Sequence, residues 1–217
     1  MKSLKNFLIL VAVKVSLSKI ELSGDYDKYT HPLNPGEDHL DIHFSFHLTQ
    51  IREIDEVKGT MIIKYSFTRI WQDDRIKFSN LENGQCRILP DEKDQIWLPW
   101  TIYDNVKHAG TFYLSDVPNV YLAKQTNDGS SKNESEIMIT YWREYIAEFM
   151  CDYDMFWFPF DTQSCSVQLY QKEDHVNLVP ENLTYGGPKK LEQYTVTGVK
   201  MCNSTFKVRP SHFVGSN

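Results

Sequence analysis

The chain has 217 residues and a formal net charge of −6, and its basic residues are spread thinly. This charge pattern excludes the basic patch that binds nucleic acid, so we expect no nucleic-acid partner. Hydrophobic residues make up 41% and aromatic residues 13%, which excludes a disordered chain. The length suits one large all-β domain or two small ones.

The N-terminus, residues 1–18, has the pattern of a signal peptide. Lys2 and Lys5 precede the apolar run Phe7–Val13, and small residues follow near a cleavage site. The run is too short to span a bilayer. The alternative is a short N-terminal helix that stays on the protein. In either case we expect residues 19–217 to form one domain.

The sequence also carries marks of an oxidising, extracellular compartment. Three N-glycosylation sequons begin at Asn133, Asn182 and Asn203. The four cysteines are an even number, as expected for a disulfide-bonded chain. One hypothesis is therefore a bond between Cys86 and Cys202.

Alternating apolar and polar residues predict a first hairpin. Strict alternation from His39 to Leu48 indicates a strand with one buried face, and a second alternating run follows from Thr60 to Trp71. The turn between them lies at residues 54–59. His39, His43 and His47 share the wet face, but side chains four apart on a strand are about 13 Å apart, so we predict no metal site.

Further runs with strand character follow the hairpin: Ile96–Tyr103, Asn119–Lys124, Ile137–Tyr145, Ser164–Tyr170 and Tyr194–Val199. No long amphipathic helix appears after residue 30. Many short strands without a βαβ rhythm predict an all-β antiparallel β-sandwich.

Cys151 and Cys165 enclose an aromatic run that contains Pro159 and is closed by Asp161. A disulfide closing a ring of about 15 residues would stabilise the fold by roughly 3 kcal/mol in the chain-entropy model. On ring size alone, the loop could equally be a surface staple with no wider role.

The ring as a whole resembles the signature loop of the Cys-loop receptors, which are pentameric ligand-gated ion channels. The matching residues are Cys151, Phe158-Pro159-Phe160-Asp161, Gln163 and Cys165. Other segments resemble the family in order and spacing: Gln50-Ile51 with Ile54-Asp55-Glu56, Trp71-Gln72-Asp73-Asp74-Arg75-Ile76, Trp97-Leu98-Pro99 with Asn105, and Tyr194-Thr195-Val196-Thr197-Gly198. The resemblance covers roughly residues 26–217, and the chain is identified as a member.

The resemblance implies an immunoglobulin-like sandwich of about ten strands in a ring of five subunits. Identical or homologous subunits would be the partners, and a small molecule would bind at each subunit boundary, without a cofactor. It also implies the Cys151–Cys165 disulfide and a place on the extracellular face of the plasma membrane. The family expects one more strand and a pore domain after residue 217. The alternative is a secreted, pore-less binding protein of the same fold.

The ligand site implied by the resemblance departs from the family's aromatic pattern. On the principal face, Asp104 and Lys172 occupy positions usually held by aromatics, and the two could pair with each other. The third principal loop offers His212 and Phe213. The complementary face offers Ser66, Thr68, Tyr121, Thr140 and Trp142. Each could instead be an ordinary strand residue at the subunit interface. A simple cage for a quaternary ammonium ligand is not expected.

The loops that transmit a signal in the family match better. Asp55, Glu56 and the tip Phe158-Pro159-Phe160-Asp161 would rest on the membrane domain. The alternative is that these loops only close the bottom of the sandwich. An enzyme is not expected, because the chain contains no G-x-S-x-G, H-E-x-x-H or P-loop motif.

Overall fold

The computed structural model describes residues 19–33, 36–79, 85–88, 90–107, 112–113, 119–125, 136–156 and 161–202. Over these residues the regular secondary structure is β-strand apart from the four-residue helix α1, and the all-β prediction is confirmed. The elements are β1 (Lys19–Leu22), β2 (Leu40–Asp55), β3 (Thr60–Gln72), β4 (Ile76–Ser79), β5 (Gln85–Arg87), α1 (Pro90–Lys93), β6 (Thr101–Tyr103), β7 (Phe112–Tyr113), β8 (Asn119–Gln125), β9 (Glu136–Met150), β10 (Leu169–Gln171) and β11 (Val176–Tyr185). No helix among the described residues is long and apolar enough to cross a membrane.

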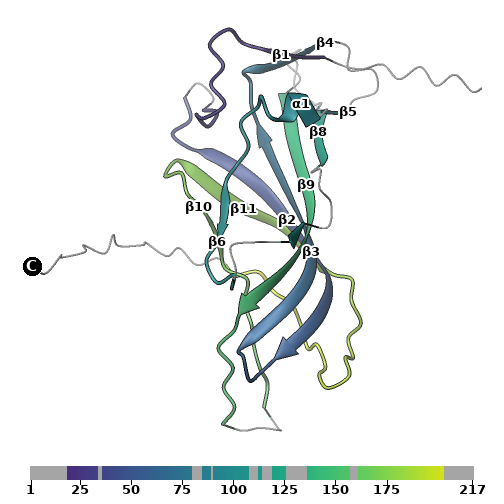
Figure 1. The fold of residues 1–217 in the computed structure, drawn as a ribbon. Helices are drawn as coiled ribbons and strands as arrows, with labels where there is room; N and C mark the ends of the chain where they lie inside the picture. Colours follow the sequence, from purple (N-terminus) through teal and green to yellow (C-terminus); the bar gives the residue numbers. More distant parts are fainter. Residues whose placement is uncertain are drawn as a thin grey trace, which may run out of the picture.

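One seven-stranded sheet forms the body of the domain, in the order β11-β2-β3-β9-β8-β5, with β7 paired to β9 (Figure 1). The predicted hairpin is confirmed, because β2 and β3 pair antiparallel from His43–Ile70 to Asp55–Thr60. Two small sheets, β1-β4 and β6-β10, complete the fold.

The antiparallel prediction is wrong for one edge, because β11 runs parallel to β2. The preceding strand, β10, belongs to a different sheet, so the chain crosses over instead of turning in a hairpin. The ladder also shifts register between Pro180 and Asn182. Proline has no N–H to donate, and an edge strand tolerates this loss.

Three of the later runs form less strand than predicted. The strand formed by the runs Ile96–Tyr103 and Ser164–Tyr170 is limited to the ladder of β6 with β10, which spans three residue pairs. Tyr194–Val199 forms no strand and contributes one isolated bridge, between Lys190 and Thr195. The other two runs correspond to β8 and β9.

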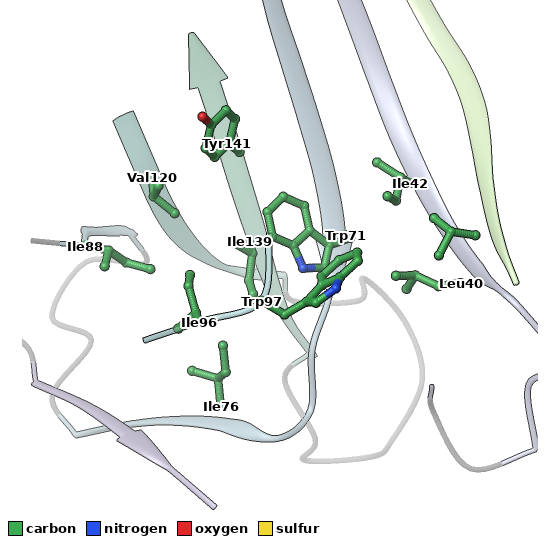
Figure 2. Packing of buried hydrophobic residues seen from close by; sticks show 11 residues of the cluster. Leu40, Ile42, Trp71, Ile76, Ile88, Ile96, Trp97, Val120, Ile139 and Tyr141 are labelled. Atoms are coloured by element: carbon green, nitrogen blue, oxygen red, sulfur yellow. The ribbon is translucent and has the colours of Figure 1, made fainter. Parts of the chain in front are cut away.

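The buried side chains form two clusters along the sandwich. The first contains Trp71 and Trp97, whose rings meet edge to face at 5.8 Å between centroids (Figure 2). The second is centred on Tyr65, Phe67 and Phe149. β3 supplies residues to both clusters, because its alternate side chains all point to the same face of the sheet.

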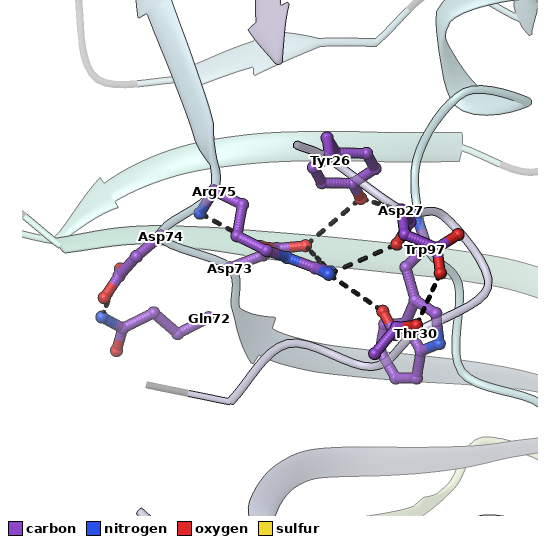
Figure 3. A network of polar contacts seen from close by, with 8 residues as sticks. All are labelled: Tyr26, Asp27, Thr30, Gln72, Asp73, Asp74, Arg75 and Trp97. Carbon is purple, nitrogen blue, oxygen red and sulfur yellow. Dashed lines mark hydrogen bonds and ion pairs between the residues drawn. The ribbon is translucent and has the colours of Figure 1, made fainter. Parts of the chain in front are cut away.

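A network of charged and polar side chains borders the first cluster. Asp73 is fully buried, and its two carboxylate oxygens accept hydrogen bonds from Arg75 Nε at 2.8 Å and Nη2 at 2.9 Å (Figure 3). Tyr26 also donates to Asp73 at 3.3 Å and accepts from the Trp97 N–H at 2.8 Å. Burial, chiefly, raises the pKa of Tyr26 to about 12. The network therefore ties the N-terminal segment to β3 and to Trp97.

Replacing Asp73 tests this network. We expect Asp73→Ala to lower the free energy of unfolding by about 3 kcal/mol, because it leaves the Arg75 charge without its buried partner. Urea unfolding measures the effect. Asp74→Ala is the matched control: Asp74 is exposed and contacts only the Gln72 side chain, so we expect a change within about 0.5 kcal/mol. Equal losses in the two variants would contradict the role given to Asp73.

Candidate functional site

The predicted principal-face residues flank the small β6-β10 sheet. The Asp104 N–H donates to the Gln168 carbonyl at 2.9 Å, just beyond the pair Tyr103–Leu169. Lys172 follows the pair Gln171–Thr101 at the other end of the ladder. Both side chains are exposed. His212 and Phe213, the candidates from the third loop, lie outside the described residues.

The suggested pairing of Asp104 with Lys172 is wrong. The structure contains no ion pair between these two described residues. They lie at opposite ends of the ladder, four residues apart, which corresponds to about 13 Å along a strand. The two charged side chains therefore lie at separate places on the domain surface.

Lys172 contacts an aromatic residue instead. Its Nζ lies over the Trp100 ring, 5.3 Å from the centroid. Trp100 is 65% exposed, which is unusual for so large a side chain. Sequence reasoning did not select Trp100, although it directly follows the matched segment Trp97-Leu98-Pro99. The aromatic surface missing at position 172 is thus supplied by Trp100, which directly precedes β6.

A buried arginine binds the residues on both sides of Trp100. Arg69 is only 6% exposed, and its Nη1 donates to the Pro99 carbonyl at 2.8 Å and to the Thr101 hydroxyl at 3.2 Å. Its guanidinium also lies over the Tyr141 ring, 4.3 Å from the centroid. Because Arg69 belongs to β3, it fixes the small sheet to one face of the large sheet. We call this the inner face; it carries Phe67, Arg69 and Trp71.

The predicted complementary residues lie on the other face of the large sheet, which we call the outer face. Thr68 on β3 is directly opposite Trp142 on β9, and Thr140 is opposite Tyr121 on β8. Ser66 belongs to the same side of β3 as Thr68 but is largely buried. Directly opposite residues in a ladder share a face, so the register brings all five positions together.

The two predicted halves of the ligand site therefore lie on opposite sides of one domain. Arg69 points inward to the segment that contains Trp100, whereas its neighbour Thr68 points outward. The core separates these two directions. Within one chain the two halves cannot contact the same small molecule.

The loops at the other end of the domain meet at Gly59. This glycine has φ +62°, and its carbonyl accepts a hydrogen bond from the Cys151 N–H at 2.8 Å. A Cβ built on Gly59 would lie 2.9 Å from the Cys151 carbonyl oxygen, closer than real Cβ contacts allow. The β2-β3 turn is thus seated on the start of the cysteine ring, and Cys151 and Cys165 form the predicted disulfide.

Side chains stabilise the β2-β3 turn itself and attach a third segment to it. Asp55 accepts from the Lys58 Nζ at 2.6 Å, and this hydrogen bond lowers the pKa of Asp55. Burial and a hydrogen bond to Glu56 raise the pKa of Tyr194, so the 188–194 segment is also attached to the turn. Asp161 lies close enough to Tyr194 to influence it electrostatically. Phe158, Pro159 and Phe160 lie outside the described residues.

Comparison with known proteins fits this arrangement. Residues 17–206 match the neurotransmitter-gated ion-channel ligand binding domain. The chain belongs to this family. Relatives include the acetylcholine receptor subunit delta of Rattus norvegicus, 26% identical over 143 residues, which are 66% of this chain and 25% of that protein. The neuronal acetylcholine receptor subunit alpha-6 of Mus musculus is 28% identical over 148 residues, which are 68% of this chain and 27% of that protein.

The ligand-binding domain spans about a quarter of the length of these curated relatives. The family is that of the ligand-binding domains of neurotransmitter-gated ion channels, so the domain is not an enzyme.

The structure also describes residues from three other sequence predictions, on cysteine pairing, histidine spacing and glycosylation. Cys202 is an exposed free thiol, so the suggested bond to Cys86 is not formed. The three histidines at every fourth position have separate partners: His39 lies beside Asp41, His43 beside Glu181, and His47 beside Thr184. Asn182 is exposed on β11, and its glycosylation stays a prediction, whereas Asn133 and Asn203 lie outside the described residues.

The contact at Gly59 can be tested by adding one methyl group. We expect Gly59→Ala to destabilise the ligand-binding domain by about 2 kcal/mol, because alanine is strained at positive φ and its Cβ meets the Cys151 carbonyl. Thermal or urea unfolding of the oxidised domain measures this. Gly24→Ala is the control, since nothing lies within 4 Å of its Cβ position and its φ is not positive. A Gly59 variant as stable as the Gly24 variant would rule out the seated turn.

Proposed function

We propose that this domain assembles into a ring of five subunits and binds a small molecule at the boundary between neighbours. The observation that carries the proposal is the placement of the two half-sites on opposite sides of one chain. A ring built from head-to-tail contacts brings unlike surfaces of adjacent subunits together. The principal half around Trp100 and Lys172 would then face the outer face of the next subunit.

The complementary half suits contact with a polar ligand. Thr68 and Thr140 offer hydroxyl groups, and Trp142 offers an indole, all only partly exposed in the single chain. Packing against a second subunit would cover this surface further. Asp104 lies at the far end of the β6-β10 ladder and would border the site.

The contact between Gly59 and Cys151 supports a second part of the proposal. Asp55, Glu56 and the tip of the cysteine ring would rest on a membrane pore domain and pass on the effect of ligand binding. Such coupling requires two states of the ring that bind the ligand unequally. A firm connection between the two loops would let them move as one body.

We further propose that the domain works on the extracellular face of the plasma membrane. The Cys151–Cys165 disulfide suits an oxidising compartment. Residues 1–18 would act as the signal peptide, and Asn133, Asn182 and Asn203 would carry glycans.

Mixing two inactive variants tests the boundary site. Trp100→Ala removes the principal half and Trp142→Ala removes the complementary half. The probe is the strongest hit from a thermal-shift screen of the wild-type ring against small amines, amino acids and carboxylates. We expect rings of either single variant to lose binding. In equal co-assembly about a quarter of the boundaries regain both intact halves, because the contacts are head-to-tail.

The assembly itself is measured first, by native mass spectrometry of the secreted domain. We expect a particle with five times the mass of the mature glycosylated chain. The double variant Trp100→Ala/Trp142→Ala, co-assembled with itself, is the control that should never regain binding. A stable monomer, or mixed rings that bind no better than the single variants, would refute the boundary site.

A further inference from the structure

We propose that the principal half-site receives an anionic group, a small carboxylate, on the ammonium of Lys172, with Trp100 as the platform that positions this ammonium. The inference rests on the proposed function, because it names the ligand class of the same site. It concerns a residue type and a contact that the aromatic pattern of the family does not predict.

The Trp100 ring is already engaged by a cation from the chain itself. Lys172 Nζ lies 5.3 Å from the ring centroid, within the distance at which an aromatic face attracts a positive charge. A quaternary ammonium ligand would have to displace Lys172 from this ring or bind beside a like charge. The site is therefore poorly suited to a cationic ligand.

Lys172 also has no counterion among the residues that the structure describes. Neither of the next two residues, Glu173 and Asp174, forms an ion pair with it, and Asp104 lies at the other end of the ladder. The Lys172 ammonium is exposed and has three N–H donors. It can accept a carboxylate without first breaking an ion pair.

A second positive charge lies behind Trp100. The Arg69 guanidinium binds the residues on both sides of Trp100, yet it forms no ion pair with any described carboxylate. More than nine-tenths of Arg69 is buried, and its Nε has no hydrogen-bond partner. A buried charge is screened much less than an exposed one, so Arg69 adds to the positive potential at the ring.

The outer face of a neighbouring subunit would not cancel this potential. Thr68, Thr140 and Trp142 are neutral. Glu144, which lies two residues from Trp142 on β9, already pairs with Lys64 at 3.7 Å. None of the five residues assigned to the complementary half-site therefore carries a negative charge that would compete for Lys172.

The test compares two simple probes, propionate and tetramethylammonium, on the assembled ring. Binding is followed through the indole N–H resonance of Trp100, assigned with a Trp100→Phe variant. We expect propionate to shift this resonance in the wild-type ring and Lys172→Met to weaken propionate about tenfold. Lys172→Met should also strengthen tetramethylammonium about tenfold, because it frees the Trp100 face.

Lys77→Met is the matched control, since Lys77 is an exposed lysine on β4, outside the β6-β10 sheet. We expect it to leave both affinities unchanged. The inference would be overturned if tetramethylammonium bound the wild-type ring as tightly as the Lys172→Met ring. It would also be overturned if Lys172→Met left the affinity for propionate unchanged. Either result leaves the mixed-ring recovery intact, so it is distinct from failure of the boundary site.

Discussion

The alternation of side chains along β3 is the constraint on which the rest of the structure depends. Tyr65, Phe67, Arg69 and Trp71 point inward, and both core clusters, the small β6-β10 sheet and the Trp100 backbone are built on them. The residues between them point outward and form part of the predicted complementary surface. A shift of one residue in this strand would exchange the two sets.

This alternation also explains how much the sequence could predict. The run from His39 to Leu48 alternates strictly and the run from Thr60 to Trp71 alternates over most of its length, and both fold as the predicted hairpin. The cysteine ring could be predicted because its motif is local and dense. β11 was missed because Pro180 and its irregular ladder hide the strand pattern, and because its partner β2 lies far away in the sequence.

The candidate site was harder to predict, because its contacts depend on register. Sequence spacing placed Asp104 and Lys172 in the site and suggested that they pair. Only the three-residue ladder of β6 with β10 reveals that they lie at opposite ends, and that Lys172 meets Trp100. The role of Gly59 likewise needs its φ of +62° and its approach to Cys151, which no local pattern encodes.

In the proposed ring, the surface around Trp100 and Lys172 meets the outer face of a second subunit. A cryo-electron microscopy structure of the assembled ring tests this most directly. We expect Lys172 of each subunit to face the strand pair that carries Thr68 and Trp142 in its neighbour. A ring in which Lys172 and Trp100 face open solvent, with Thr68 and Trp142 in no subunit contact, would contradict the account.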